Sequence, residues 1–187
     1  MGDRFILTAN EVRQALFMRI NQAQVHHDLL VALRDSTATP DNLVKFNRNL
    51  RFFAGVESAL YNSTVVLLYS LYESRKDTVN FYQLLRLSAE AFSDTELTEY
   101  QDRIKGIKPT WMRVGIIRNE LVGHQTLERD RAAAELKADL KLSDVDALLA
   151  HAKKLLFDIS SRHFDTHVDY MGDSRDAVSK LLSRVAL

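Results

Sequence analysis

The fold is decided by residues 40–76, PDNLVKFNRNLRFFAGVESALYNSTVVLLYSLYESRK, because this stretch can be read as helix or, in part, as strand. Its segment TVVLLYSLY, residues 64–72, would alone be compatible with a β-strand, since short apolar runs have no decisive period. Thr39, just before the stretch, and Pro40 at its start suit an N-cap and the first turn of a helix, and only Gly55 disfavours a helix inside the stretch. We therefore predict one long helix over 40–76, with a kink near Gly55 or Asn62.

The rest of the chain carries similar helical signals. Thr8 and Glu11 have the spacing of a capping box, which predicts a first helix over 10–33. Further helices are expected at 78–91, 94–105 and 109–122, from Ser143 towards His167, and within 174–187. The predicted fold class is all-α, with long antiparallel helices in one domain over 1–187, or with residues 168–187 as a C-terminal helical arm.

Composition excludes several classes of protein. The 187 residues include no Cys, which rules out disulfides, thiolate catalysis and cysteine-based zinc sites and suits a cytoplasmic location. The longest uninterrupted apolar run, VVLLY at 65–69, is far shorter than the roughly 20 residues of a membrane helix. The N-terminus carries an acid early, where a signal peptide would carry basic residues. We therefore expect no membrane partner.

The charge distribution is balanced overall but locally uneven. Formal net charge is zero, so no global field draws the protein to nucleic acid. Between residues 103 and 119 there is no Asp or Glu, and the cationic residues are Arg103, Lys105, Lys108, Arg113 and Arg118. This run predicts a basic patch.

Arg118 is the most informative residue in that run. Helical spacing places it within about 80° of Val114 and Leu121, on an apolar face. A buried guanidinium needs a carboxylate, carbonyl groups or an anionic ligand. One interpretation is a structural arginine paired with a core acid, accompanied by a Glu120–His124 pair. The other is an anion site in which the glycine before His124 ends the helix and redirects the histidine, which would otherwise point about 120° away.

The other candidate residues are weaker. His163 and His167 have a helical spacing that suits two metal ligands, but no acid completes a set, so hydrogen-bonded histidines are favoured and no metal or cofactor is expected. His27 is expected to be a core histidine. Residues 70–77, SLYESRKD, form a charged cluster that is typical of a solvated helix end. Phosphate-loop, metalloprotease and esterase motifs are absent from the sequence.

Two stretches carry a resemblance to a known family. RNELVGH, residues 118–124, resembles the signature of the HEPN superfamily, and VVLLYSLYESRKDTVNFYQLLRLSA, residues 65–89, is similar to the segment that precedes it in the abortive-infection AbiU-like branch. The resemblance spans about 65–126, and the flanking residues match as generic helices. It implies a HEPN-like helical bundle, metal-independent RNA cleavage, and a homodimer in which two motifs meet, in phage defence or beside an antitoxin.

The resemblance also implies roles for particular residues. Arg118 would bind the scissile phosphate, His124 would transfer a proton with the RNA 2′-hydroxyl as nucleophile, and Asn119 would orient either group. The residues expected to contact RNA are Lys105, Lys108, Arg113 and Trp111, the last of which would stack a base or else belong to the core. The residues expected to hold the substrate-binding side chains in place, without contacting RNA themselves, are Glu73, Arg75, Asp77 and Glu120.

A different class of function is compatible with the same resemblance. A HEPN-like dimer without catalysis would bind a partner protein or a nucleotide. The presence of Arg118, Asn119 and His124 together favours the enzyme, because a site that has lost its activity has no chemical reason to keep both ends of the motif.

Overall fold

The computed structural model describes residues 7–123 and 131–184, and every regular element in these ranges is a helix. Helix α1 (Ala9–Ser36) begins at Thr8, whose hydroxyl accepts a hydrogen bond from the Glu11 backbone N–H while the Glu11 carboxylate accepts one from the Thr8 N–H. The predicted capping box is therefore confirmed. The all-α fold class is confirmed as well.

The deciding stretch forms two helices rather than one. Helix α2 (Pro40–Arg48) and helix α3 (Leu50–Tyr72) meet at Asn49, whose φ of −120° leaves the helical region. The Asn49 side chain donates to the Lys45 carbonyl oxygen at 3.1 Å, which stabilises the end of α2. The break lies at Asn49 rather than near Gly55 or Asn62, and α3 is continuous through both of those positions.

The next predicted helix, 78–91, is shorter than expected. Helix α4 (Phe81–Leu87) begins at Asn80, whose side-chain oxygen caps it, and a 3₁₀ turn, η1 (Ala89–Ala91), follows. Helix α5 (Asp94–Gly106) has the capping box predicted from Ser93 and Glu96. The Ser93 hydrogen bonds also lower the pKa of the Glu96 carboxyl, since they favour its ionised form.

The second half of the chain contains one helix that the sequence patterns did not predict. Helix α6 (Lys108–Ile117) leads into a turn of π-helix, η2 (Arg118–Gly123), and α7 (Arg131–Ala138) is the unpredicted element. Helix α8 (Leu142–His163) is the long predicted helix, and α9 (Asp176–Arg184) is the predicted short amphipathic one.

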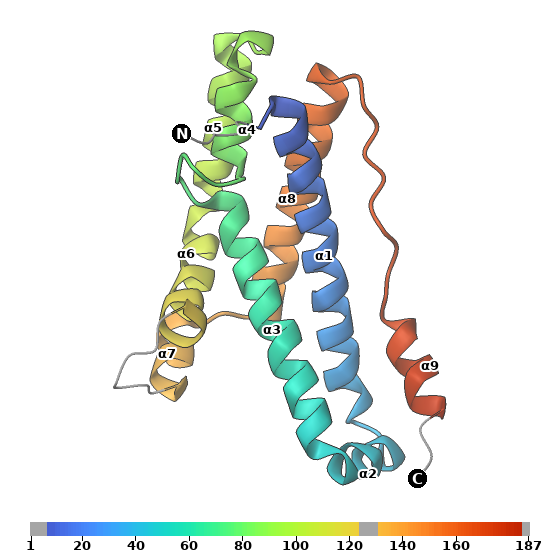
Figure 1. The fold of residues 1–187 in the computed structure, drawn as a ribbon. Coiled ribbons are helices and arrows are strands. Elements are labelled where there is room, and N and C mark those ends of the chain that lie inside the picture. Colours follow the sequence, from blue (N-terminus) through green and yellow to red (C-terminus); the bar gives the residue numbers. More distant parts are fainter. Residues whose placement is uncertain (1–6, 124–130, 185–187) are drawn as a thin grey trace, which may run out of the picture.

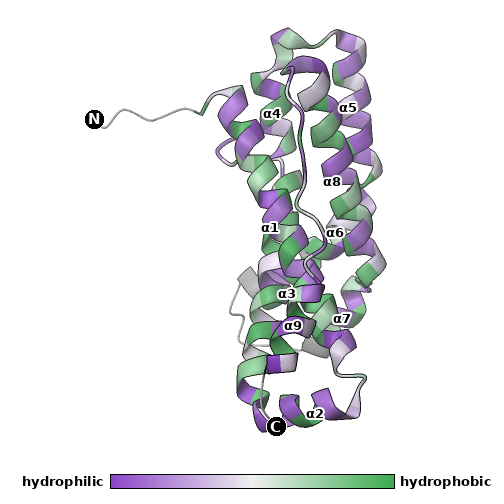
Figure 2. Ribbon diagram, turned by 90° about the vertical axis from the view of Figure 1, so that its right-hand side faces the viewer, coloured by the Kyte–Doolittle hydropathy of each residue, from purple (hydrophilic) through white to green (hydrophobic). Residues whose placement is uncertain are grey.

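The long helices run antiparallel around one elongated core. In Figure 1, α1 descends, α3 and α8 ascend beside it, and α5 and α6 descend on the far side of α3. Figure 2 shows hydrophilic residues on the outward faces of these helices. The core is formed by apolar side chains, and burying a large one stabilises the fold by roughly 1.5–3 kcal/mol. The fully buried members include Leu16, Ile20, Leu68, Phe81, Leu84, Tyr100, Leu148 and Leu156. None of the described helices is both long and apolar enough to cross a bilayer.

After α8 the chain returns along α1 as an extended strap, residues 164–174 (Figure 1). Buried polar groups of α1 hold it: the Asn21 side-chain oxygen accepts from the Met171 backbone N–H at 3.1 Å, and Asp28 accepts from the Ser174 N–H at 3.4 Å. The Asp28 side chain is only 4% exposed and also lies 3.6 Å from the Arg175 guanidinium. The strap delivers α9 to a second apolar cluster at the lower end of α1 and α3.

Replacing Asp28 should loosen the strap and α9 without unfolding the bundle. Asp28→Ala leaves the Ser174 N–H without its acceptor and removes the buried carboxylate beside Arg175, so we expect the free energy of unfolding to fall by about 1–3 kcal/mol. Trypsin should also cleave after Arg175 faster. The control is Asp35→Ala, which removes an exposed acid from the last turn of the same helix. Equal cleavage rates in the two variants would show that Asp28 does not anchor the strap.

Candidate functional site

Helix α6 crosses α3 closely at Gly115. A Cβ atom built on Gly115 would lie 3.3 Å from Cε2 of Tyr69, which is tighter than ordinary van der Waals contact. The glycine is buried, and no other residue type would leave the Tyr69 ring in this place without a shift. The lack of a side chain at Gly115 thus allows the Tyr69 ring to lie directly on α6.

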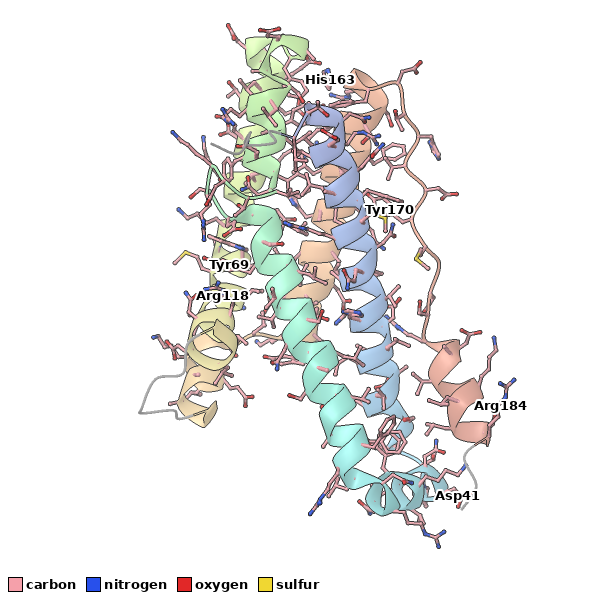
Figure 3. The ribbon with its side chains drawn as sticks, viewed as in Figure 1. Asp41, Tyr69, Arg118, His163, Tyr170 and Arg184 are labelled. Atoms are coloured by element: carbon pink, nitrogen blue, oxygen red, sulfur yellow. The ribbon has the colours of Figure 1, made fainter. Side chains whose placement is uncertain are left out.

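The Tyr69 ring is flanked by two residues of the α6 segment. The Trp111 indole stacks on it, with ring centroids 5.2 Å apart and planes inclined by 23°, and its Nε1–H donates to the Tyr69 carbonyl oxygen at 3.0 Å. The Arg118 guanidinium carbon lies 5.1 Å from the centre of the same ring. We call this group of Trp111, Tyr69 and Arg118 the Tyr69 stack. Figure 3 shows Tyr69 and Arg118 side by side at the junction of α3 and α6.

Arg118 is held but remains available to a ligand. The residue is half-buried, and its Nη1 donates to the neighbouring Asn119 side-chain oxygen at 2.9 Å. Within the described ranges no carboxylate forms an ion pair with it, so the core acid expected for a structural arginine is not found there. A guanidinium has five N–H donors in a planar fork. The Tyr69 ring contact uses none of them and the Asn119 hydrogen bond uses one, so most remain for an anion.

The backbone changes character at Arg118. The sequence predicted α-helix through residue 122, but residues 118–123 form the π-helical turn η2. Such turns use i→i+5 hydrogen bonds and occur frequently at functional sites. The prediction of an unbroken α-helix was therefore wrong at its C-terminal end. His124, the proposed proton-transfer residue, follows η2 directly in the sequence and lies outside the described residues.

Helix α7 supports the π-helical turn. The Lys137 ammonium of α7 donates to the Glu120 carboxylate of η2. Glu120 therefore supports the turn through Lys137, and the expected pairing of Glu120 with His124 cannot be described. Because α7 was not predicted, this ion pair could not be anticipated either.

The basic run of residues 103–119 is largely neutralised within the protein. Arg103 pairs with Asp158 at 2.9 Å on α8, and both side chains are mostly buried. Ion pairs also connect Lys105 with Asp102 and Arg113 with Asp144. The Arg113 pair and, more strongly, a hydrogen bond from the Lys141 backbone lower the pKa of the Asp144 carboxyl. In the described part of the chain, the cations of this run that lack a carboxylate partner are Lys108 and Arg118.

The charged cluster at residues 70–77 pairs with itself. The Arg75 guanidinium donates two hydrogen bonds to Asp77, at 3.0 and 2.7 Å, which raises the pKa of Arg75 and lowers that of Asp77. Both side chains are about two-thirds exposed. Burial lowers the pKa of Arg19 on α1, and the nearby Glu73 charge opposes this shift. Near the C-terminal end of α3, the residue that contacts Arg118 is Tyr69. No described contact joins Glu73, Arg75 or Asp77 to Arg118.

The two histidines with metal-ligand spacing are separated by the end of a helix. Helix α8 ends at His163, so His167 lies in the extended strap and does not share a helical face with it. His163 Nδ1–H donates to the Ala91 carbonyl oxygen at 3.2 Å, while its Nε2 lies 3.3 Å from the Tyr100 hydroxyl. His167 is exposed beside the Phe157 ring. The expectation of a shared helical face was wrong, whereas the expectation of a hydrogen-bonded His163 is confirmed.

His27 is a core histidine, as predicted. It is 1% exposed and its Nε2 lies 2.9 Å from an Asp146 carboxylate oxygen of α8. Among residues 7–123 and 131–184, no group of three histidine or acidic side chains is placed to hold a metal ion.

Sequence reasoning missed Tyr69 and Gly115, which build the candidate site with Arg118 and Trp111. The available signal was the spacing of residues 111, 115 and 118, which fall on one side of a helix with a glycine in the middle. A glycine inside an apolar helix usually has a packing reason. The partner that fills its space lies on another helix, and only the fold identifies it as Tyr69.

The close crossing can be tested with two matched glycine variants. Gly55 lies in the interior of α3 with nothing within 4 Å of an added Cβ, so Gly55→Ala should raise the free energy of unfolding by about 0.5–1 kcal/mol. Gly115→Ala should gain less, because the methyl group pushes on the Tyr69 ring. It should also shift the fluorescence of Trp111, the single tryptophan of the chain. Equal stabilisation by both variants, with unchanged emission, would contradict the crossing.

Comparison with known protein families gives one match, which covers most of the chain. A protein-family model, HEPN_AbiU2, described as AbiU2, matches residues 4–181 and thus includes the Tyr69 stack and all of the helices but the end of α9. The comparisons with curated proteins and with solved structures found no match. The family match is much longer than the 65–126 segment that carries the visible sequence resemblance. The chain belongs to the AbiU2 family of HEPN proteins.

Proposed function

We propose that this protein is a metal-independent endoribonuclease of HEPN type. The observation that carries the proposal is the state of Arg118: the residue is held against the Tyr69 ring, has no carboxylate partner in the described chain, and lies in a π-helical turn six residues before His124. A half-buried guanidinium placed in this way is suited to bind a phosphate, because its planar fork matches two phosphate oxygens.

The proposed reaction uses the substrate's own nucleophile. The RNA 2′-hydroxyl oxygen attacks the adjacent phosphorus, the bond from phosphorus to the 5′-oxygen breaks, and the products carry a 2′,3′-cyclic phosphate and a 5′-hydroxyl. One proton leaves the 2′-hydroxyl and one is delivered to the 5′-oxygen. Arg118 stabilises the negative charge that develops on the phosphoryl oxygens.

His124 and Asn119 have supporting roles in this proposal. His124 exchanges a proton with the 2′-hydroxyl or the leaving oxygen, which an imidazole can do near neutral pH. The Asn119 side-chain oxygen already accepts a hydrogen bond from Arg118, so it fixes the orientation of the guanidinium. Asn119 is exposed, and its NH₂ group is left to donate to a phosphate oxygen.

A homodimer is part of the proposal because one chain offers a single arginine and a single histidine of this motif. The surface next to the Tyr69 stack includes two exposed apolar side chains, Val66 of α3 (43% exposed) and Met112 of α6 (55% exposed). Packing of this face against a second copy would bury both and would bring two motifs together.

Membership of the AbiU2 family supports a role in abortive infection, in which an antitoxin protein is a further proposed partner.

Cleavage of RNA in the presence of EDTA is the first expected result. Arg118→Lys keeps the charge but loses the fork, and we expect it to lower the cleavage rate by about 10²-fold or more. His124→Ala should lower it similarly. The measurement is gel analysis of labelled RNA with identification of cyclic phosphate ends. Activity lost on chelation and restored by Mn²⁺ would contradict the mechanism, and tight RNA binding without cleavage would favour a non-catalytic dimer.

Anions should stabilise the dimer. Two arginines that share one cleft repel each other when the cleft is empty, and a bound sulfate or RNA phosphate relieves the repulsion. Light scattering should therefore give the mass of a dimer at micromolar concentration, and a sulfate series should raise the melting temperature of the natural protein but not of Arg118→Ala. A monomer whose melting temperature ignores sulfate would rule out a composite site.

A further inference from the structure

A small cavity lies next to the Tyr69 stack and belongs to no role assigned so far. It has a volume of about 80 Å³ and lies where the end of α3 meets α4 and the junction of α5 and α6. Its described lining residues are Tyr72, Ser74, Tyr82, Ile104, Lys108 and Trp111. Trp111 is thus shared between the cavity and the Tyr69 stack, so a ligand in the cavity lies beside the candidate site.

The polar groups around the cavity suit an anion. Lys108 contributes an exposed ammonium group without a carboxylate partner in the described chain, and Ser74 and Tyr82 contribute hydroxyl groups. None of the six described lining residues is acidic. The Tyr72 hydroxyl is engaged elsewhere, since it donates to the Leu148 carbonyl oxygen at 3.1 Å and lies 2.9 Å from His151 Nδ1. A lysine with hydroxyl donors is a common arrangement for binding phosphate.

The size of the cavity decides between a base and a phosphate. A cavity of about 150 Å³ holds one benzene ring, so 80 Å³ is too small for a nucleobase to enter. A phosphate group is smaller than a six-membered ring with its substituents, and it fits the donors. One face of the Trp111 indole is also covered by Tyr69. Trp111 is therefore better suited to line the cavity than to stack on a nucleobase.

The cavity and Arg118 lie on the same side of α6. At 100° per residue, Lys108 falls within about 80° of Arg118, and Trp111 lies between them. Ten residues at a rise of 1.5 Å separate Lys108 from Arg118 by about 15 Å along the axis. At the 3.4 Å rise of a stacked strand this corresponds to about four nucleotides. One RNA strand along α6 can therefore reach both cations.

We propose that the cavity beside Trp111 is a second phosphate subsite, in which Lys108 and the hydroxyls of Ser74 and Tyr82 bind an RNA backbone phosphate about four nucleotides from the one at Arg118. This inference rests on the proposed function, because it assigns the ligand as RNA. It sets a minimum length for a tightly bound substrate. It also assigns the contacts with the RNA backbone to Lys108 and Arg118, the two cations of the basic run that have no carboxylate partner among the described residues.

The first test compares RNA lengths with a non-cleavable 2′-deoxy substitution at the scissile position. Lys108→Ala should weaken binding of an eight-nucleotide strand about fivefold at 0.1 M salt and lower the salt slope by about 0.7, as expected for one lost single-strand phosphate contact. Binding of a dinucleotide at Arg118 should not change. The control is Arg51→Ala, which removes an exposed cation from the start of α3 at the other end of the bundle. Equal affinities of the two variants for the longer strand would overturn the subsite.

The second test uses Trp111 fluorescence, which reports on this region alone because the chain has no other tryptophan. Inorganic phosphate should change the emission of Arg118→Ala in a saturable way, and the change should disappear when Lys108→Ala is added. Uridine, which has no phosphate, should have no effect. A response to uridine but not to phosphate would overturn the proposal.

The two tests separate the subsite from the enzyme. Cleavage of RNA with no contribution from Lys108 would refute the subsite and leave the ribonuclease standing. A Lys108-dependent response to phosphate in a protein that neither binds nor cleaves RNA would refute the ribonuclease and leave an anion site for another ligand.

Discussion

The contact on which the candidate site depends is the crossing of α3 and α6 at Gly115. Because this residue has no side chain, the Tyr69 ring lies against α6 and meets Trp111 on one side and Arg118 on the other. A cation–π contact of this kind contributes only about 0.5–1 kcal/mol at an exposed site. Its main effect is on geometry, because it restricts the conformations of the Arg118 side chain before any ligand binds. The Asn119 hydrogen bond restricts the same guanidinium from another direction.

The electrostatics of the protein explain how a chain of zero net charge can still present an anion site. Ion pairs within the fold neutralise Arg103, Lys105 and Arg113, so these residues serve stability and local order more than recognition. Lys108 and Arg118 have no carboxylate partner in the described chain and fall within about 80° of each other around α6. Attraction for a polyanion is then local and short-ranged, because salt screens exposed charges beyond about 10 Å at 0.1 M. Such a surface favours a ligand that contacts both cations over non-specific binding.

Periodicity and capping residues predicted most of the helices, because those signals are local: the Thr8 and Ser93 boxes gave correct starts for α1 and α5. The errors arose where the decision is not local. Asn49 ends α2 by donating from its side chain to the Lys45 carbonyl oxygen, and α7 is a short helix tied to η2 through Lys137. The same difference between local and non-local signals applies to the candidate site. Arg118 stood out from its place on an apolar face, whereas Tyr69 could be identified only after the fold had placed α3 against α6.

The position of the site within the fold also bears on how two copies would meet. The polar clasps of the molecule, Asp28 with the strap and His27 with Asp146, lie along α1 and α8, away from the Tyr69 stack. They pair polar groups on the α1–α8 side of the bundle with partners inside the protein. Helices α3 and α6 instead carry exposed Val66 and Met112, and Arg118 follows α6 without a carboxylate partner in the described chain. Zero net charge removes long-range repulsion between copies, so the repulsion that remains is local to the two arginines, where a phosphate can balance it.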